Sequence, residues 1–258
     1  MKFIHLFPIL IFIALSCSSE NGPIDSEDDR SIDPEQESQV LLQVAGYTYY
    51  ELVGFNVFVE DKAFTNDEAM TQEALDLLER KLIDVTELGL NKTILNQLQA
   101  VNIFVDWQTT NGSAVFHPSA VWLMQNGYIT EKAGAIEISN IKNFINWTNK
   151  NQPFLVLHEL AHGYHHSMSN NDANRLAITE AYQNAISSNL YKNVAYDLGN
   201  GNYSTAQEAY ALTSEGEYFA ELTEAFFGQN DYFPFDKEDL ENYDSVGFKA
   251  LEMAWEQF

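Results

Sequence analysis

The spacing of apolar side chains in the first half of the chain predicts strands on either side of two helices. Residues 47–60 are rich in aromatic and β-branched side chains, which is typical of a strand. Apolar residues then recur at intervals of three and four, which indicates a helix that begins at residues 65–68 and ends at Gly89. A short helix over residues 92–99 and a buried strand over residues 101–105 are expected to follow.

Helical spacing dominates the second half of the chain. Residues 107–128 are interpreted as a loop with a short helix near its end, and residues 133–138 as a short strand. Helices are predicted over residues 152–168, 172–190 and 213–227 and around Lys237 and Phe248, with a turn at residues 200–202. Strands before residue 152 and helices after it indicate an α+β fold. A small mixed sheet with helices would form an N-terminal lobe (about residues 40–168), and a mainly helical C-terminal lobe (about residues 169–258) would follow.

The first residues have the pattern of an export signal. Lys2 is followed by an apolar run, residues 3–15, that is too short to span a membrane comfortably. The small and apolar residues before Cys17 resemble the lipobox of bacterial lipoproteins, which implies removal of residues 1–16 and lipidation of Cys17. We therefore expect an exported protein held at the bacterial cell envelope by its lipid anchor alone. The alternative is an ordinary secretory signal with an incidental cysteine. Cys17 is the only cysteine, so an internal disulfide is excluded.

An acidic segment separates this signal from the rest of the chain. Residues 18–39 contain eight acidic residues and one arginine, too polar a composition to bury a core. We interpret residues 17–39 as a flexible tether and residues 40–258 as the folded domain. The formal net charge of the whole chain is −25 at pH 7, which argues against nucleic acid and anionic membrane surfaces as partners. The same acidity either favours basic peptides as substrates or merely keeps the surface solvated.

The predicted helix over residues 152–168 carries the most specific motif in the chain. Its segment His158-Glu159-Leu-Ala-His162 places two imidazoles four residues apart, on one face of a helix and about one turn from each other. Both rings can therefore reach one zinc ion, while Glu159 lies beside it, within reach of a water on the ion. Chance matches to such a motif occur, but the apolar flanks here indicate a buried helix, in which two histidines and a glutamate need a partner.

Carboxylates later in the chain are candidates for the third zinc ligand. Glu217, Glu221 and Glu224 recur at intervals of four and three, on one face of the predicted helix 213–227. A solvated acidic face is the alternative, although the surrounding residues are apolar enough for burial. The spacing does not decide between Glu217 and Glu221. His165 and His166 follow the motif closely, but one straight helix rarely turns three side chains onto one ion, so we expect them to support or line the site.

Two blocks of this chain resemble the gluzincin metallopeptidases, and specifically the catalytic domain of the anthrax lethal factor type. These blocks are the His158-Glu-x-x-His162 motif and the later Glu217-Tyr-Phe-Ala-Glu221 segment. The resemblance implies that Glu217 is the third zinc ligand and that Glu221 orients a histidine ligand. It also implies that Tyr210, seven residues before Glu217, assists catalysis. The order of predicted strands and helices places the metal-site helix at the seam of the two lobes, and the resemblance implies a zincin-like fold.

The predicted function is hydrolysis of peptide bonds by an exported enzyme with one Zn²⁺ per chain. Glu159 would act as general base toward a metal-activated water, and the substrate would be a peptide or protein. The strand near residues 136–138 is expected to border the substrate cleft. His117 either lines that cleft or has a structural role. The alternatives are a non-catalytic surface lipoprotein that retains a metal site, and a zinc hydrolase of non-peptide substrates.

Overall fold

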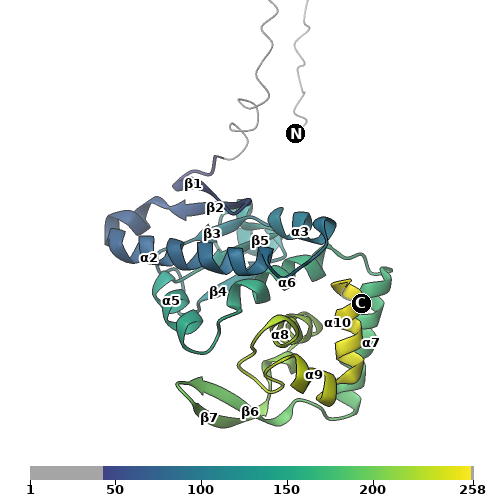
Figure 1. Ribbon diagram of the computed structural model, residues 1–258. Helices are drawn as coiled ribbons and strands as arrows, with labels where there is room; N and C mark the ends of the chain where they lie inside the picture. Colours follow the sequence, from purple (N-terminus) through teal and green to yellow (C-terminus); the bar gives the residue numbers. More distant parts are fainter. Residues whose placement is uncertain (1–42, 257–258) are drawn as a thin grey trace, which may run out of the picture. The chain divides into compact units, whose positions relative to one another are not determined.

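A mixed five-stranded sheet organises the first part of the fold in a computed structural model that describes residues 43–256 (Figure 1). The strands are β1 (Tyr47–Leu52), β2 (Phe55–Glu60), β3 (Ile103–Val105), β4 (Ala114–His117) and β5 (Ala135–Ile138), in the spatial order β1-β2-β3-β5-β4. The inner strands β2, β3 and β5 are parallel, and the outer strands β1 and β4 are antiparallel to their neighbours. The predicted α+β class is confirmed. The predicted signal peptide 1–16, the lipidation of Cys17 and the tether 17–39 lie outside the described residues.

Helices make up most of the remaining chain, and several of them cover one face of this sheet. They are α2 (Asp61–Thr86), α3 (Lys92–Gln99), α4 (Ala120–Gln125), α5 (Ile141–Lys150), α6 (Leu155–Ser167), α7 (Ala173–Ser187), α8 (Glu215–Phe227), α9 (Lys237–Tyr243) and α10 (Ser245–Ala254), with short 3₁₀ turns η1 (Thr130–Lys132) and η2 (Tyr210–Leu212). None of the helices between residues 43 and 256 has the length and apolarity that a membrane crossing requires.

The alternation of side chains along the strands gives the sheet two different faces. One face, which includes Val57, Ile103 and Ile136, joins the main core with the helices. The opposite face carries a smaller cluster of Phe58, Phe104 and Ala135. Residues paired across β4 and β5 share a face, so Phe116, which is opposite Ile136, belongs to the helical side. The neighbouring β4 residues Val115 and His117 belong to the other side.

Helix α6 lies between the sheet and α8, and so joins the two parts of the fold (Figure 1). Its close approach to β4 depends on Gly163, because a Cβ there would lie 3.0 Å from Val101 Cγ2 and 3.4 Å from Phe116 Cε2. On its other side, Tyr164 stacks on Trp255, whose side chain is fully buried. The helix is therefore buried on several sides, which holds its side chains in fixed positions.

The structure corrects several predicted boundaries near the start of the domain. The predicted strand 47–60 is a hairpin, in which Val53 and Gly54 form the turn with φ values of 55° and 81°. Helix α2 begins at Asp61, earlier than predicted, and is kinked at Asp67 (φ −159°, ψ 94°). The Asp67 side chain accepts a hydrogen bond from the Met70 amide at 3.0 Å. The predicted start at residues 65–68 is thus the start of the second helical segment.

Four elements were not predicted at all. Strand β4 lies in the segment that was interpreted as a loop, and α5 precedes the metal-motif helix. The antiparallel strands β6 (Lys192–Gly199) and β7 (Asn202–Glu208) follow α7, so the part of the chain predicted to be mainly helical also contains a strand pair. Most residues of β7 are exposed and polar, and this strand therefore lacks the apolar alternation that predicts strands. The expected cleft strand, β5, is an inner strand; the edge is formed by β4.

A buried ion cluster lies on the face of the sheet opposite the main core. Lys132 Nζ lies 2.5 Å from Asp106 Oδ2 and 3.1 Å from Glu137 Oε1. His117 Nε2 lies 2.5 Å from Glu137 Oε2, so His117 has a structural role in this cluster. Although burial opposes the charged form, hydrogen bonds from His117 and Lys132 lower the pKa of Glu137 to about 2.

Replacing Lys132 by Met is expected to destabilise the protein strongly. The substitution leaves Asp106 and Glu137 buried without their shared cation, and breaking a buried ion pair in this way costs about 3–5 kcal/mol. Urea unfolding measures the loss. The matched control is Lys81→Met, because Lys81 pairs with the half-exposed Asp84 on the surface at 2.9 Å, and such pairs contribute about 0–1 kcal/mol. Equal effects of the two substitutions would show that the Lys132 cluster does not stabilise the fold.

Candidate metal centre

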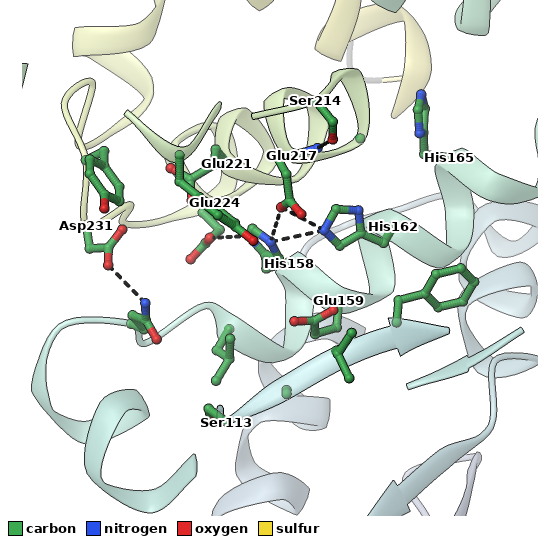
Figure 2. A pocket seen from close by; sticks show the side chains of 18 of the residues that line it. Ser113, His158, Glu159, His162, His165, Ser214, Glu217, Glu221, Glu224 and Asp231 are labelled. Atoms are coloured by element: carbon green, nitrogen blue, oxygen red, sulfur yellow. Dashed lines mark hydrogen bonds and ion pairs between the residues drawn. The ribbon is translucent and has the colours of Figure 1, made fainter. Parts of the chain in front are cut away.

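Helix α6 brings the two motif histidines together at the bottom of a cavity (Figure 2). The Nε2 atoms of His158 and His162 lie 3.2 Å apart, as expected for side chains one turn apart on a helix face. His158 is buried and His162 is partly buried. Two imidazole nitrogens this close to each other can bind one cation together.

Helix α8 supplies a carboxylate that completes the group. Ser214 caps this helix, since its hydroxyl accepts a hydrogen bond from the Glu217 amide at 3.1 Å. Glu217 therefore lies in the first helical turn, with Oε2 at 3.1 Å from His158 Nε2 and 3.0 Å from His162 Nε2. Although burial raises it, contact with the two imidazoles lowers the pKa of the Glu217 carboxyl below its ordinary value.

The Nε2 atoms of His158 and His162 and Oε2 of Glu217 form a triangle whose dimensions and chemistry fit a zinc ion. The three atoms are separated by 3.0–3.2 Å. A tetrahedral zinc site with bonds of about 2.0–2.1 Å has ligand–ligand edges of about 3.3–3.4 Å, close to these separations. Two imidazoles and one carboxylate are also a common donor set of catalytic zinc sites, which keep one position open. His158, His162 and Glu217 could thus hold zinc with little rearrangement.

Glu224 contacts the His158 ring at Nδ1, the ring nitrogen that does not face Glu217 (Figure 2). Its Oε1 lies 2.7 Å from His158 Nδ1, so Nδ1 can donate a hydrogen bond to Glu224 while Nε2 is directed toward Glu217. We expected this contact from Glu221, but the Glu221 carboxylate accepts a hydrogen bond from Asn230 Nδ2 at 3.1 Å. Seven residues are close to two full turns, so Glu224 returns to nearly the direction of Glu217 and Glu221 is rotated away from it.

Removing the Glu224 carboxylate is expected to weaken zinc binding without removing a ligand. Partners of ligating histidines typically contribute 10–100-fold to metal affinity, so Glu224→Ala should raise the zinc Kd by about that factor. Competition with a chromophoric chelator measures the Kd. Glu224→Gln, which retains an oxygen acceptor, should recover part of the loss. Glu208→Ala on β7 is the exposed control. An unchanged Kd in Glu224→Ala would mean that this contact does not tune the site.

Glu159 lies beside the triangle, next to the edge strand β4 (Figure 2). The residue is buried, and the backbone amide of Phe116 on β4 donates a hydrogen bond to its carboxylate. Burial raises the pKa of Glu159 above its ordinary value, while the neighbouring imidazoles of His158 and His162 oppose that rise. A carboxylate with a raised pKa that faces a cavity is suited to accept and return a proton.

Tyr210 faces the same cavity from η2, just before α8. Its side chain is partly open to solvent, and its pKa is raised by burial and by the nearby negative charge of Glu217. Its phenol group is therefore protonated at neutral pH and available as a hydrogen-bond donor. The structure thus brings all five residues of the predicted catalytic set into one place: His158, Glu159, His162, Tyr210 and Glu217.

The cavity above the triangle has a volume of about 530 Å³. Its walls come from the edge strand and from elements far apart in the sequence, and include Ser113, Ala114, Phe116, Trp147, Tyr196, Asp231 and Tyr232. A space of this size accommodates several side chains of a peptide, whereas a closed structural zinc site would be filled by a fourth ligand.

His165 and His166 do not join the triangle. His165 Nε2 lies 3.1 Å from Glu215 Oε1, and Arg175 Nε lies 2.7 Å from the same oxygen. This group ties α6, α7 and α8 together, and burial, with the Arg175 charge, lowers the pKa of His165 to about 4. His166 packs near the Phe116 ring and lines the cavity. The bridging position of Glu215 was missed, although a glutamate at the start of a predicted helix was visible in the sequence.

Searches against protein-family models, curated proteins and solved structures find no match to this chain. The resemblance to the gluzincin metallopeptidases therefore stays a prediction.

Proposed function

We propose that this chain is a zinc-dependent metallopeptidase in which His158, His162 and Glu217 hold the ion. The observation that carries the proposal is the convergence of three ligand atoms, within 3.0–3.2 Å of one another, beside a buried glutamate at an open cavity. A structural site has no use for Glu159, whereas a hydrolase needs a base at this position.

The residues around the triangle have separate roles in the proposed hydrolysis. Zinc, when bound, supplies Lewis-acid activation of water and of the substrate carbonyl group. Glu159 accepts the proton of the attacking water and returns it to the nitrogen of the leaving amine. Glu224 keeps the His158 ring in the tautomer that presents Nε2 to the ion, through its 2.7 Å contact with Nδ1.

Tyr210 is proposed to donate a hydrogen bond to the oxyanion that forms during attack. Loss of one such donor costs about 10²–10³ in rate, so Tyr210→Phe should lower kcat by that factor, with a smaller change in KM. The zinc content should stay the same. The matched control is Tyr203→Phe on β7, where the side chain is 59% exposed. If Tyr210→Phe and the control have equal kcat, Tyr210 has no catalytic role.

The edge strand favours a peptide over a non-peptide substrate. Among residues 43–256, β4 is the last strand of the sheet, so one of its sides has no strand partner. Its inner side faces β5, where the His117 carbonyl accepts a hydrogen bond from the Gly134 amide at 2.7 Å. An extended peptide could add to the outer side by main-chain hydrogen bonds, which would bring its carbonyl groups past Glu159.

The proposal is tested by mapping cleavage of a mixed peptide library by mass spectrometry. Cleavage should occur with zinc, stop with a chelator and return when zinc is restored. Stoichiometric zinc without cleavage of any peptide would favour the non-catalytic metal-binding alternative. Cleavage that persists in excess chelator would contradict the proposed zinc chemistry.

A further inference from the structure

A second hollow lies against β4, and it is separate from the metal triangle. It has a volume of about 650 Å³ and lies between the edge strand, the segment around Gly112 and helix α4. Its walls include Val115, Trp122 and Tyr128. The side chains of Val115 and His117 place it on the side of the sheet opposite the main core.

The hollow is built from aromatic side chains that brace one another. The His117 ring stacks on Trp122, with centroids 6.0 Å apart, and Tyr128 lies 5.6 Å from both rings. Because His117 is also held by Glu137, the wall is anchored to the buried ion cluster. Trp122 is nevertheless 48% exposed and Val115 39% exposed. A rigid wall that leaves this much apolar surface in water is suited to receive an apolar group.

The charge of the hollow contrasts with that of the metal cavity. Of the described residues that line it, none is Asp, Glu, Lys or Arg, and its titratable side chains are His117 and Tyr128. The metal cavity is lined by several carboxylates, among them Glu217, Glu221 and Asp231. In a chain with a formal net charge of −25, an uncharged hollow with an aromatic wall discriminates against charged ligands.

The hollow adjoins the metal cavity along the edge strand. Ala114, Val115, Phe116 and Pro118 line both, so the two spaces meet along the edge strand. A peptide that pairs with this strand has side chains that alternate between the two faces of the sheet. Those on the face of Phe116 would enter the metal cavity. Those on the face of Val115 would enter the hollow.

We propose that this hollow, lined by Val115, Trp122 and Tyr128, is a specificity subsite for a large apolar or aromatic side chain of the peptide substrate. The proposal rests on the metallopeptidase function proposed above. The preference for a substrate would then depend on side chains on the face of the sheet opposite the main core, as well as on the residues around the metal.

Comparison of cleavage profiles on a peptide library tests this subsite. The wild-type protein should prefer Phe, Tyr, Trp, Leu or Met over Ala at one fixed position of its substrates, by about 10–100-fold in kcat/KM. Trp122→Ala should reduce this preference about tenfold, while preferences at other positions remain. Met124→Ala is the matched control, since Met124 lies on the same helix, is 64% exposed and is absent from the described lining of the hollow.

A second variant distinguishes a change of specificity from a loss of folding. Trp122→Arg places a cation in the wall, so it should shift the preference at the same position toward Asp and Glu, a gain that only a folded enzyme can show. Cleavage without an apolar preference, or a preference that both Trp122 variants leave unchanged, would overturn the subsite but leave the peptidase function intact. The absence of cleavage by the zinc-loaded wild-type protein would overturn both.

Discussion

Glu159→Gln is expected to lower kcat for peptide cleavage by at least 10²–10⁴, the usual contribution of a general base. The amide cannot accept the proton of the attacking water, yet it has nearly the same shape as the carboxylate it replaces. Glu159 contacts the Phe116 amide and lies outside the triangle of ligand atoms, so the zinc content should remain unchanged. Steady-state kinetics and metal analysis of the same sample measure both quantities.

Glu180→Gln is the matched control, because Glu180 is exposed on α7. It should leave both kcat and the zinc content at wild-type values. Activity retained in Glu159→Gln would remove Glu159 as the base. Loss of zinc together with activity would instead mean that Glu159 is a ligand.

Glu217→Ala is expected to abolish both stable zinc binding and activity. Glu217 Oε2 contacts both Nε2 atoms at 3.0–3.1 Å, so its removal leaves two ligands from one helix. The zinc Kd should rise by more than the roughly 10–100-fold expected for a residue that only supports a ligand. Because an ion that binds the folded state raises stability, added zinc should raise the Tm of the wild-type protein but not of this variant.

Glu238→Ala provides the comparison for this variant, because Glu238 is exposed on α9. It should respond to zinc as the wild-type protein does. A zinc-induced rise in Tm that is equal in Glu217→Ala and in the wild-type protein would show that the ion binds elsewhere.

The helices of the metal centre were predictable because local chemistry specifies them. The pair His158 and His162 defines one face of α6, and Ser214 caps α8 at the start of the predicted helix 213–227. Glu217 needed the resemblance as well, since spacing alone left it equivalent to Glu221. Neither segment by itself indicates that α6 and α8 pack against each other.

The elements and contacts that were not predicted depend on interactions between distant parts of the chain. Strand β4 is four residues long and borders a cavity, so it lacks a long apolar alternation and was interpreted as a loop. Strand β7 of the second hairpin is almost entirely exposed, and main-chain pairing with β6 holds it in place. Whether Glu221 or Glu224 reaches His158 is decided by a small difference in direction around α8, together with the position of Asn230.

X-ray absorption at the zinc K-edge of the zinc-loaded protein tests the metal centre most directly. Two imidazoles and a carboxylate, with one further light atom, should give about four nitrogen or oxygen neighbours at about 2.0–2.1 Å, and the imidazole scattering should correspond to two rings. Scattering from one ring or from three, or a failure to bind zinc in a one-to-one ratio, would contradict a site made by His158, His162 and Glu217.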